Sequence, residues 1–505
     1  MITIMTTLDT SSNEHPTGRA SIRRFKPTYR VRFVKNKSVD VVEASNYWSS
    51  SEYNATNCWN QNFNNGNVNN NNRYNSNYVR ALAALGDEWK MSWYQAYLDC
   101  IRHKLGSHDC CTFRMLRLDE VWQLMVDVHD LQYKPGISKT FCVSHPKVRE
   151  IFAADFRDRI VHHWIYNELN PIIENLFETQ CNISYNCRKG YGTLRCINAV
   201  VDDIHTVQHS SIEPDEKGPW ILKIDIRSFF MSIDRRLLWQ RVKSLITEHY
   251  NGKWKKELLH VVHATLAHSP QQHCVRCGDL SLWNVLPSHK SLFNAPPLVG
   301  TPIGNLPSQQ FDNFFMLIFD IWLVSRLTEV GGMAKRFVDD IEGIVPRKED
   351  AKRIVKDARA FLERELHLTL HPDKVYLQPV RHGVQFIGTV IKGKRRYTSN
   401  RTVDSFCKAV RRLDRTCAYI VSPKCKAPLA KRLFHLRKAV DSVNAYIGLM
   451  SHHDSYAIRS RHLFACQHLA PLCHIEGHSL LIRINKKVLT ARTVYRLLQL
   501  SRRGY

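Results

Sequence analysis

The amino-acid sequence predicts an α+β protein that is divided into two to four packed subdomains and contains an antiparallel sheet. Three observations lead to this fold class. The chain has 505 residues, more than one hydrophobic core normally organises. Several segments carry apolar residues at helical spacing, and two short apolar runs have the composition of strands, one of them folded back as a hairpin. With 44% hydrophobic and 23% charged residues, a peptide hormone and a wholly disordered chain are excluded.

Helices are expected early in the chain and again after a short extended segment. Residues 87–104 and 118–131 have aromatic and aliphatic side chains at near-helical intervals. A strand is expected at 140–144, and the stretch after it leads into a helix whose apolar face includes Trp164. Pro171 predicts a break or a bend in that helix, because proline lacks the backbone donor.

The elements of the second half carry carboxylates. Residues 220–226 contain no turn former, which predicts a buried strand with Asp225 at its end. The sequence KRFVDDIEGIV places Asp339 and Asp340 between apolar flanks, a pattern typical of a tight hairpin with acids at its tip. Between these two elements, an apolar helix is expected over residues 311–322.

The charge balance points to a polyanionic partner. The formal net charge is +26 and the pI is about 9.6, which favours nucleic acid. The longest apolar run, residues 314–324, is interrupted by Asp320 and is shorter than the roughly 20 residues of a membrane span. The N-terminus has no cationic start followed by a long apolar stretch, so we expect a cytoplasmic protein without a membrane segment.

The fifteen cysteines show no regular framework and are expected to be reduced thiols. One CxxC pair, Cys274 and Cys277, has no second pair nearby, which favours a turn with two free thiols. His268 and His273 keep a zinc site open as the alternative.

A buried carboxylate such as Asp225 is usually a structural cap, and an Asp-Asp hairpin alone is usually only a turn. Together, Asp225, Asp339 and Asp340 form three carboxylates that are able to converge on two divalent cations about 3.5 to 4 Å apart. Such a site suits phosphoryl and nucleotidyl transfer, and its hard oxygen ligands favour Mg²⁺.

These motifs carry a resemblance. KIDIRSFFMSID and RFVDD resemble the two catalytic palm motifs of reverse transcriptases. HPKVREIFAADFRDRIVHH and SYNCRKGYGT resemble fingers motifs, LHPDKV and GVQFIGTVI resemble later palm motifs, and SVNAYIGLMSHHDSYAIR resembles a thumb segment. The resemblance covers residues 86–459 and implies a right-hand polymerase with fingers, palm and helical thumb, acting as an RNA-directed DNA polymerase. Phe337 departs from the tyrosine that is common before xDD, and Glu342 is unusual in an apolar strand.

One segment narrows the family. GTPIGNLPSQ reads IGxxxSQ where most reverse transcriptases read QGxxxSP, and this is similar to the enzymes of diversity-generating retroelements. The resemblance then implies copying of a template-repeat RNA into cDNA with errors at adenines, for mutagenic retrohoming into a target gene. Interpreted from its residues alone, the segment is a junction between a loop and a helix, in which Gly304 permits close backbone approach.

The resemblance also implies roles for individual residues. Asp225, Asp339, Asp340 and the Ile226 carbonyl match the ligands of two Mg²⁺ ions. The residues that match substrate contacts are Lys147, Arg149, Phe230, Ile303, Gly304, Gln309 and Lys374. Among these, Lys147 and Arg149 match the fingers cations that grip a triphosphate, and a solvated surface charge is the less favoured alternative for each. Phe230 matches the aromatic residue that excludes a ribose 2′-hydroxyl, and Lys374 matches a palm lysine near the leaving pyrophosphate.

The N-terminal part differs in composition from the rest. Between residues 46 and 77, fourteen of thirty-two residues are asparagine, which taken alone indicates a polar low-complexity tract. Its interleaved aromatics resemble the translated template repeat of such retroelements. The expected domains are therefore an unassigned segment 1–44, a template-repeat-like segment 45–85, fingers and palm 86–393, and a basic helical thumb with tail 394–505. The first 85 residues are expected to be poorly structured or absent from the natural product.

The expected partners are template RNA, primer or cDNA, and deoxynucleoside triphosphates. The resemblance adds a small, basic, oligomeric accessory protein. Alternatives are a reverse transcriptase of a group II intron, retron or phage-defence system, an RNA-binding scaffold with an inactive palm, and a lectin-like display protein. The IGxxxSQ motif argues against the other reverse transcriptases, and the three intact acids argue against an inactive scaffold. The 400 residues after the asparagine tract argue against a lectin-like protein.

Overall fold

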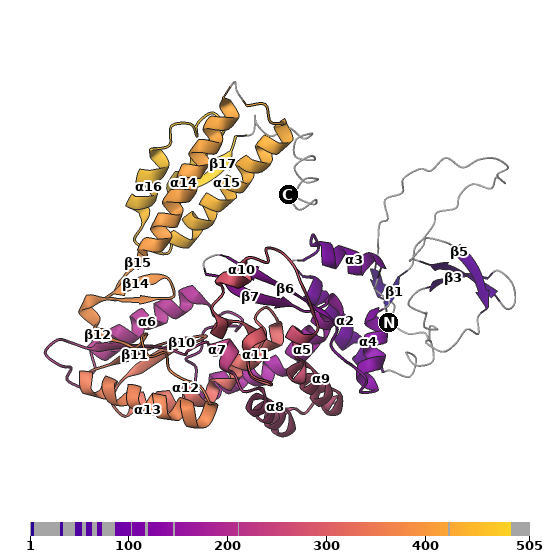
Figure 1. Ribbon diagram of the computed structural model, residues 1–505, viewed down its shortest axis with the longest axis horizontal. Coiled ribbons are helices and arrows are strands. Elements are labelled where there is room, and N and C mark those ends of the chain that lie inside the picture. The colour runs from indigo at the N-terminus through magenta and orange to yellow at the C-terminus, as the bar shows by residue number, and fades with distance from the viewer. Residues whose placement is uncertain are drawn as a thin grey trace. The chain divides into compact units, whose positions relative to one another are not determined.

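The computed structural model describes residues 86–102, 104–116, 120–144, 147–210, 212–422 and 425–485, and five short strands in the first 85 residues (Figure 1). The chain divides into two compact units, Met1–Tyr133 and Lys134–Tyr505. The N-terminal strands are β1 (Ile2–Ile4), β2 (Val31–Phe33), β3 (Asn46–Glu52), β4 (Asn57–Asn62) and β5 (Val68–Asn72). Strands β3, β4 and β5 form an antiparallel sheet within the asparagine-rich segment. The rest of that segment, and most of residues 1–44, lie outside the described residues.

Three helices of the first unit lie within the described residues. The two expected helices are present as α2 (Asp87–Ile101) and α4 (Glu120–His129), which pack together through buried faces. Between them lies α3 (His108–Leu116), which the sequence pattern did not predict.

The second unit begins with a three-stranded sheet of the fingers. Strand β6 (Ser138–Val143) pairs antiparallel with β7 (Arg149–Ala153) and parallel with β9 (Cys274–Arg276). The strand expected at 140–144 is therefore confirmed. Cys274 and Cys277 are free thiols, and their sulfur atoms lie 3.7 Å from the Gln271 carbonyl and 3.5 Å from the Thr140 carbonyl.

Helix α5 (Phe156–Gln180) corrects the expectation of a break at Pro171, because it continues through that residue. Trp164 and Leu169 before the proline are fully buried, and Ile173 and Phe177 after it are almost fully buried. Each large apolar side chain contributes roughly 1.5–3 kcal/mol on burial. The packing of both halves therefore outweighs the cost of about 3 kcal/mol for an internal proline.

The palm is a four-stranded antiparallel sheet in the order β10-β11-β8-β12 (Figure 1). Its strands are β8 (Trp220–Asp225), β10 (Met333–Phe337), β11 (Asp340–Val345) and β12 (Tyr376–Pro379). Helix α6 (Thr193–Gln208) covers one face, and α12 (Leu317–Thr328) and α13 (Lys348–Leu366) cover the other. Strand β8 and the hairpin β10–β11 confirm the strands expected from the sequence.

The apolar helix expected over 311–322 is two helices, α11 (Leu306–Phe315) and α12, separated at Met316. They pack on different partners. Helix α11 contacts α5 and α8 (Arg235–His249), whereas α12 contacts α13 and β10. The chain changes direction between two cores, which a continuous run of apolar residues does not reveal. Helix α9 (Lys255–Ala267) packs on α8 and α5.

A small sheet and a helical thumb follow the palm. The sheet consists of β13 (Val384–Phe386), β14 (Thr389–Lys392) and β15 (Arg395–Thr398). The thumb helices are α14 (Asn400–Val421), α15 (Leu429–Met450) and α16 (Tyr456–Phe464), followed by the hairpin β16 (Cys473–Glu476) and β17 (Leu481–Ile484). They share a core that includes Phe406, Leu436 and Met450. This architecture is the right-hand polymerase fold expected from the sequence.

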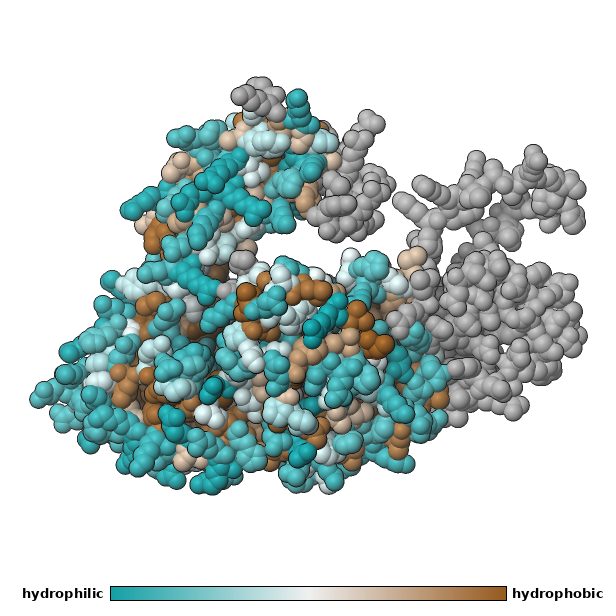
Figure 2. Space-filling model, viewed as in Figure 1, coloured by the Kyte–Doolittle hydropathy of each residue, from teal (hydrophilic) through white to brown (hydrophobic). Residues whose placement is uncertain are grey.

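The surface is mostly hydrophilic in the view of Figure 2, with brown hydrophobic residues in small groups. Exposed apolar side chains include Val275, Leu280 and Val285 in the fingers. Within the part of the chain that the structure describes, no helix is both long and apolar enough to cross a bilayer.

Candidate active site

The palm sheet brings the three predicted acids to one edge. In the pairing of β8 with β11, Asp225 lies directly opposite Asp340. Side chains directly opposite each other in an antiparallel pair lie on the same face. Strand β10 ends at Phe337, which pairs with Asp340, so the hairpin turn consists of Val338 and Asp339 alone. The sequence prediction of a tight acidic hairpin next to Asp225 is confirmed in its topology.

This turn has an unusual backbone. Val338 has φ +61°, a conformation that is rare for a β-branched residue and costs of order 1–3 kcal/mol. Two side chains hold it in place. The Val338 N–H donates to Asn186 Oδ1 at 2.9 Å, and Arg336 Nη1 donates to the Val338 carbonyl at 3.1 Å. Arg336 is itself fixed by two 2.6 Å contacts with the carboxylate of Asp320, and neither residue is exposed. The acids therefore stand on a turn that a buried ion pair supports.

Two lysines contact the acids. Lys374 Nζ donates to Asp225 Oδ2, and Lys223 Nζ lies 3.5 Å from Asp340 Oδ1. Asp339 has no such cation at hydrogen-bond distance among the interactions of the described residues. The pKa of Asp339 is raised to about 6. Burial is the main cause, the negative charges of Asp225 and Asp340 add to it, and Lys374 opposes them. The site therefore has a deficit of positive charge around Asp339.

The donor set fits a hard divalent cation, because carboxylate oxygens are the ligands that Mg²⁺ prefers and the mutual repulsion of the acids favours a cation between them. In the described part of the chain, no three His, Cys, Asp or Glu side chains are already arranged to hold a metal ion. Asp225 and Asp340 are engaged by lysines instead, so cation binding requires these side chains to exchange partners.

A loop of residues 298–305 joins the palm to the fingers. Its backbone pairs with the segment that carries Phe230: Thr301 N–H donates to the Phe230 carbonyl at 2.7 Å, and Gly300 N–H donates to the Ile233 carbonyl at 2.8 Å. Phe230 lies in the single turn α7 (Phe229–Ser232) and its side chain is half-buried. The next residues of the loop turn to the fingers.

There, the Phe152 N–H donates to the Ile303 carbonyl at 2.8 Å, and Ala154 N–H donates to Asn305 Oδ1 at 3.3 Å. Gly304 has φ +117°, and a Cβ at this position would lie 2.7 Å from the Phe152 carbonyl oxygen. Only glycine fits, as the expected close backbone approach requires. The Ile303 side chain packs against a small apolar cluster that includes Phe152.

The predicted fingers cations lie at the start of strand β7 and just before it. Arg149 begins β7, the strand to which the loop is bonded, and its side chain is exposed. Lys147 is exposed two residues earlier. Gln309 and Phe337 line an open groove together with Tyr166, Tyr185, Lys189 and Tyr191. Hydrogen bonds thus link the loop of residues 298–305 to the Phe230 segment and to β7, and they link Lys374 to Asp225.

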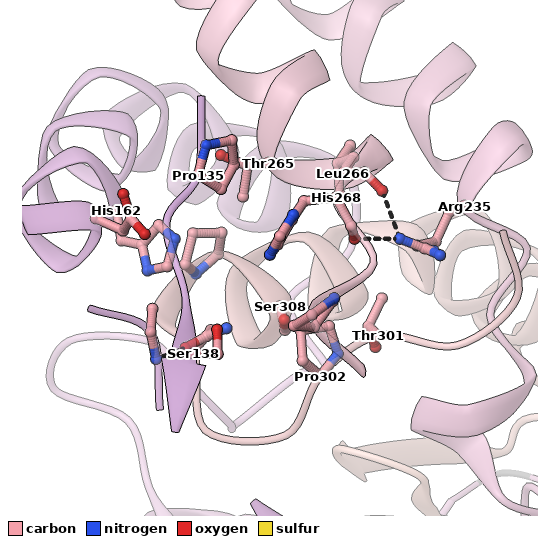
Figure 3. Close-up of a pocket in the computed structure, with 15 residues that line it drawn as sticks. Pro135, Ser138, His162, Arg235, Thr265, Leu266, His268, Thr301, Pro302 and Ser308 are labelled. Carbon is pink, nitrogen blue, oxygen red and sulfur yellow. Dashed lines mark hydrogen bonds between the residues drawn. The ribbon is translucent and has the colours of Figure 1, made fainter. Parts of the chain in front are cut away.

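Behind the loop lies a cavity of about 30 Å³, shown in Figure 3. Thr301, Pro302 and Ser308 lie on one side, with His162 and His268 on others. The pKa of His162 is lowered to about 3, mainly by burial and additionally by His163, Arg159 and His268. His162 is therefore a neutral core residue at physiological pH.

Glu342, which is unusual in its strand, is almost fully buried two residues along β11 from Asp340. Neither carboxyl oxygen has a hydrogen-bond partner within the described part of the chain. Lys223 and Lys335 lie opposite it on the two neighbouring strands. Burial raises the pKa of Glu342 to about 8, although Lys223 lowers it. The raised pKa favours the neutral form of this buried carboxyl.

The sequence reasoning missed the residues that hold the site. Asn186 and Arg336 fix the turn. Thr301 contacts the Phe230 carbonyl, and Asp312 contacts Thr301. Arg336 could have been recognised, because an arginine in a buried strand seldom lacks an acidic partner. The partner, Asp320, is on another element and was not identifiable from spacing.

An antiparallel palm with three acids at one edge defines a template-directed polymerase of the right-hand class. Residues 137–391, slightly more than half of the chain, match the family model described as "Reverse transcriptase (RNA-dependent DNA polymerase)". The chain belongs to the reverse transcriptase family, whose members are RNA-directed DNA polymerases.

Similar proteins were found by sequence and by structure. The chain is 24% identical over 298 residues to Protein YkfC of Escherichia coli (strain K12), covering 52% of this chain and 68% of that protein. Among solved structures, apo telomerase from Candida tropicalis is 12% identical with a TM-score of 0.38, over 65% of this chain and 61% of that one. A form truncated from its C-terminal domain is 14% identical with a TM-score of 0.37, over 52% and 55%. The chain thus covers less than two thirds of these telomerase chains.

Proposed function

We propose that this reverse transcriptase serves a diversity-generating retroelement: it copies a template-repeat RNA into cDNA with errors at adenines, and the cDNA diversifies a target gene. The observation that carries the proposal is Ile303. An apolar residue stands where most reverse transcriptases have glutamine, on a loop bonded both to the segment of Phe230 and to strand β7. A side chain in this position is suited to influence how the templating and incoming bases are held.

The polymerase chemistry is assigned to the palm acids. Asp225, Asp339, Asp340 and the Ile226 carbonyl would hold two Mg²⁺ ions, which when bound supply charge neutralisation for the attacking 3′-hydroxyl and the leaving pyrophosphate. Lys374 would then release Asp225 and bind the pyrophosphate instead. Lys147 and Arg149 would bind the triphosphate, and Phe230 would exclude a ribose 2′-hydroxyl.

The thumb supports binding of template and primer. Helix α14 buries Phe406, Val410 and Leu413 and turns its cations outward. Exposed cations of the thumb region include Arg411, Arg412, Arg415, Lys426, Lys431, Arg437 and Lys438. Lys424 lies outside the described residues. Exposed cations that bind phosphates release counterions, so affinity is expected to fall steeply as salt concentration rises.

The decisive experiment is sequencing of cDNA that the purified protein makes from a defined template-repeat RNA with its flanking sequence. We expect misincorporation opposite adenine to exceed that opposite the other three bases, and no cDNA from Asp339→Asn. Equal error rates at all four bases would leave a reverse transcriptase but remove the proposed role.

The accessory partner is tested with the same RNA. We expect cDNA yield to rise when a small, basic, oligomeric accessory protein is added, and to be lower on an unrelated RNA. Equal yield on any RNA without that protein would contradict this part of the proposal.

A further inference from the structure

Phe230 is held in position through its backbone. It lies in a single helical turn that follows Ser228, a residue with φ +50°. One turn of helix has little stability of its own. The position of the Phe230 ring therefore depends on the neighbouring loop, whose Thr301 N–H donates to the Phe230 carbonyl at 2.7 Å.

The side chain of Thr301 adds a second contact to the same carbonyl. Its Oγ1 lies 3.3 Å from the Phe230 carbonyl oxygen and 2.7 Å from Asp312 Oδ2. Thr301 and Asp312 are each only 1% exposed. Asp312 comes from helix α11, so three separate segments meet at this point.

The Thr301 hydroxyl has one proton and lies between two acceptor oxygens. It donates to Asp312 Oδ2 at 2.7 Å, and its contact with the Phe230 carbonyl at 3.3 Å is the longer of the two. Asp312 thus orients the hydroxyl that adjoins the Phe230 carbonyl. Burial raises the pKa of Asp312 well above its usual range. Asp312 Oδ1 has no hydrogen-bond partner within the described part of the chain, which agrees with a neutral carboxyl more readily than with a buried charge.

We propose that Thr301 and Asp312 are positioning residues for Phe230 and thereby help to set the discrimination between deoxyribonucleotides and ribonucleotides. This inference rests on the proposed role of Phe230. The ring excludes a 2′-hydroxyl only where its distance from the sugar is fixed, and the two side chains fix the backbone from which the ring extends. A displacement well under the size of a hydroxyl group would admit ribose more easily.

The test is single-nucleotide incorporation with a matched dNTP and rNTP, expressed as the ratio of the two kcat/KM values. This ratio is insensitive to a general loss of active protein. Thr301→Val removes the hydroxyl and keeps the branched shape. We expect the ratio to fall by about fivefold to tenfold, the effect of one lost hydrogen bond.

Thr301→Ser keeps the hydroxyl and is expected to retain the wild-type ratio. Asp312→Asn keeps an oxygen that accepts the bond from the Thr301 hydroxyl and is expected to retain the ratio as well, whereas Asp312→Ala is expected to lower it as Thr301→Val does. The matched control is Thr265→Val. The Thr265 hydroxyl is also buried and lines the cavity behind the loop, but it is not bonded to the Phe230 segment, so the ratio is expected to be unchanged.

Phe230→Ala separates the two levels of the argument. A wild-type ratio in both Thr301→Val and Asp312→Ala, together with a reduced ratio in Phe230→Ala, would overturn the positioning role alone. An unchanged ratio in Phe230→Ala would overturn the proposed role of Phe230, and the positioning role with it.

Discussion

Asp225 and Asp340 lie directly opposite each other in the antiparallel pair β8–β11, although 114 positions separate Asp225 from the hairpin turn at Asp339. Their alignment follows from strand register, and a shift by one residue would move every side chain of a strand to the other face. The register is thus part of the proposed active site. It leaves three carboxylates at one edge, where their mutual repulsion is relieved only by cations.

The first prediction concerns these acids. Asp225→Asn and Asp339→Asn are expected to reduce Mg²⁺-dependent primer extension by roughly three orders of magnitude, because several kcal/mol of charge stabilisation are lost. Stability should not fall in Asp339→Asn, since burial and like charges disfavour its ionised form. Primer extension and thermal unfolding test this. Asp357→Asn, an exposed acid on α13, is the control. Extension near the wild-type rate in both variants would refute the palm assignment.

The second prediction concerns the pair that supports the turn. Arg336→Met or Asp320→Asn alone is expected to lower the free energy of unfolding by about 3–5 kcal/mol, because each leaves a buried charge or its donors without a partner. The double variant Arg336→Met/Asp320→Leu should recover much of that loss. It should not recover activity, because the Val338 carbonyl still lacks its donor. Urea unfolding measures the first effect and primer extension the second; additive losses in the double variant would contradict the coupling.

These residues show how far the sequence could lead. The strand ending at Asp225 and the hairpin at Asp339 and Asp340 were predictable, because short local patterns specify both. Asp320 illustrates the limit: in the sequence it is only a charge that interrupts an apolar run, and its role depends on Arg336 on another element. Pro171 is a second case, since packing on both sides overrides the local preference. Contacts between distant segments cannot be deduced from spacing.

The third prediction concerns pH. His162 has a folded-state pKa of about 3, below the value of about 6.5 for an exposed histidine. The unfolded chain therefore binds a proton that the folded chain does not, and stability is lost as pH falls below 6.5. Between pH 6.5 and 5 the contribution is about 2 kcal/mol.

Urea unfolding at these two pH values measures the loss, and His162→Asn is expected to reduce it by about that amount. His478→Asn, an exposed histidine in the thumb region, should leave the pH dependence unchanged. The same pH dependence in His162→Asn as in the wild type would exclude His162 as its source.

The last prediction concerns Ile303, whose carbonyl is bonded to the Phe152 N–H whatever its side chain is. Substitution therefore changes the side chain while the loop keeps this bond to β7. Ile303→Gln introduces the residue that most reverse transcriptases have here and removes apolar contacts with the cluster around Phe152. We expect the ratio of errors opposite adenine to errors opposite other bases to fall several-fold. Ile303→Leu keeps an apolar side chain and should retain the bias. Sequencing cDNA from one defined RNA with the three proteins decides the matter, and an unchanged ratio in Ile303→Gln would remove this residue from the account of adenine errors.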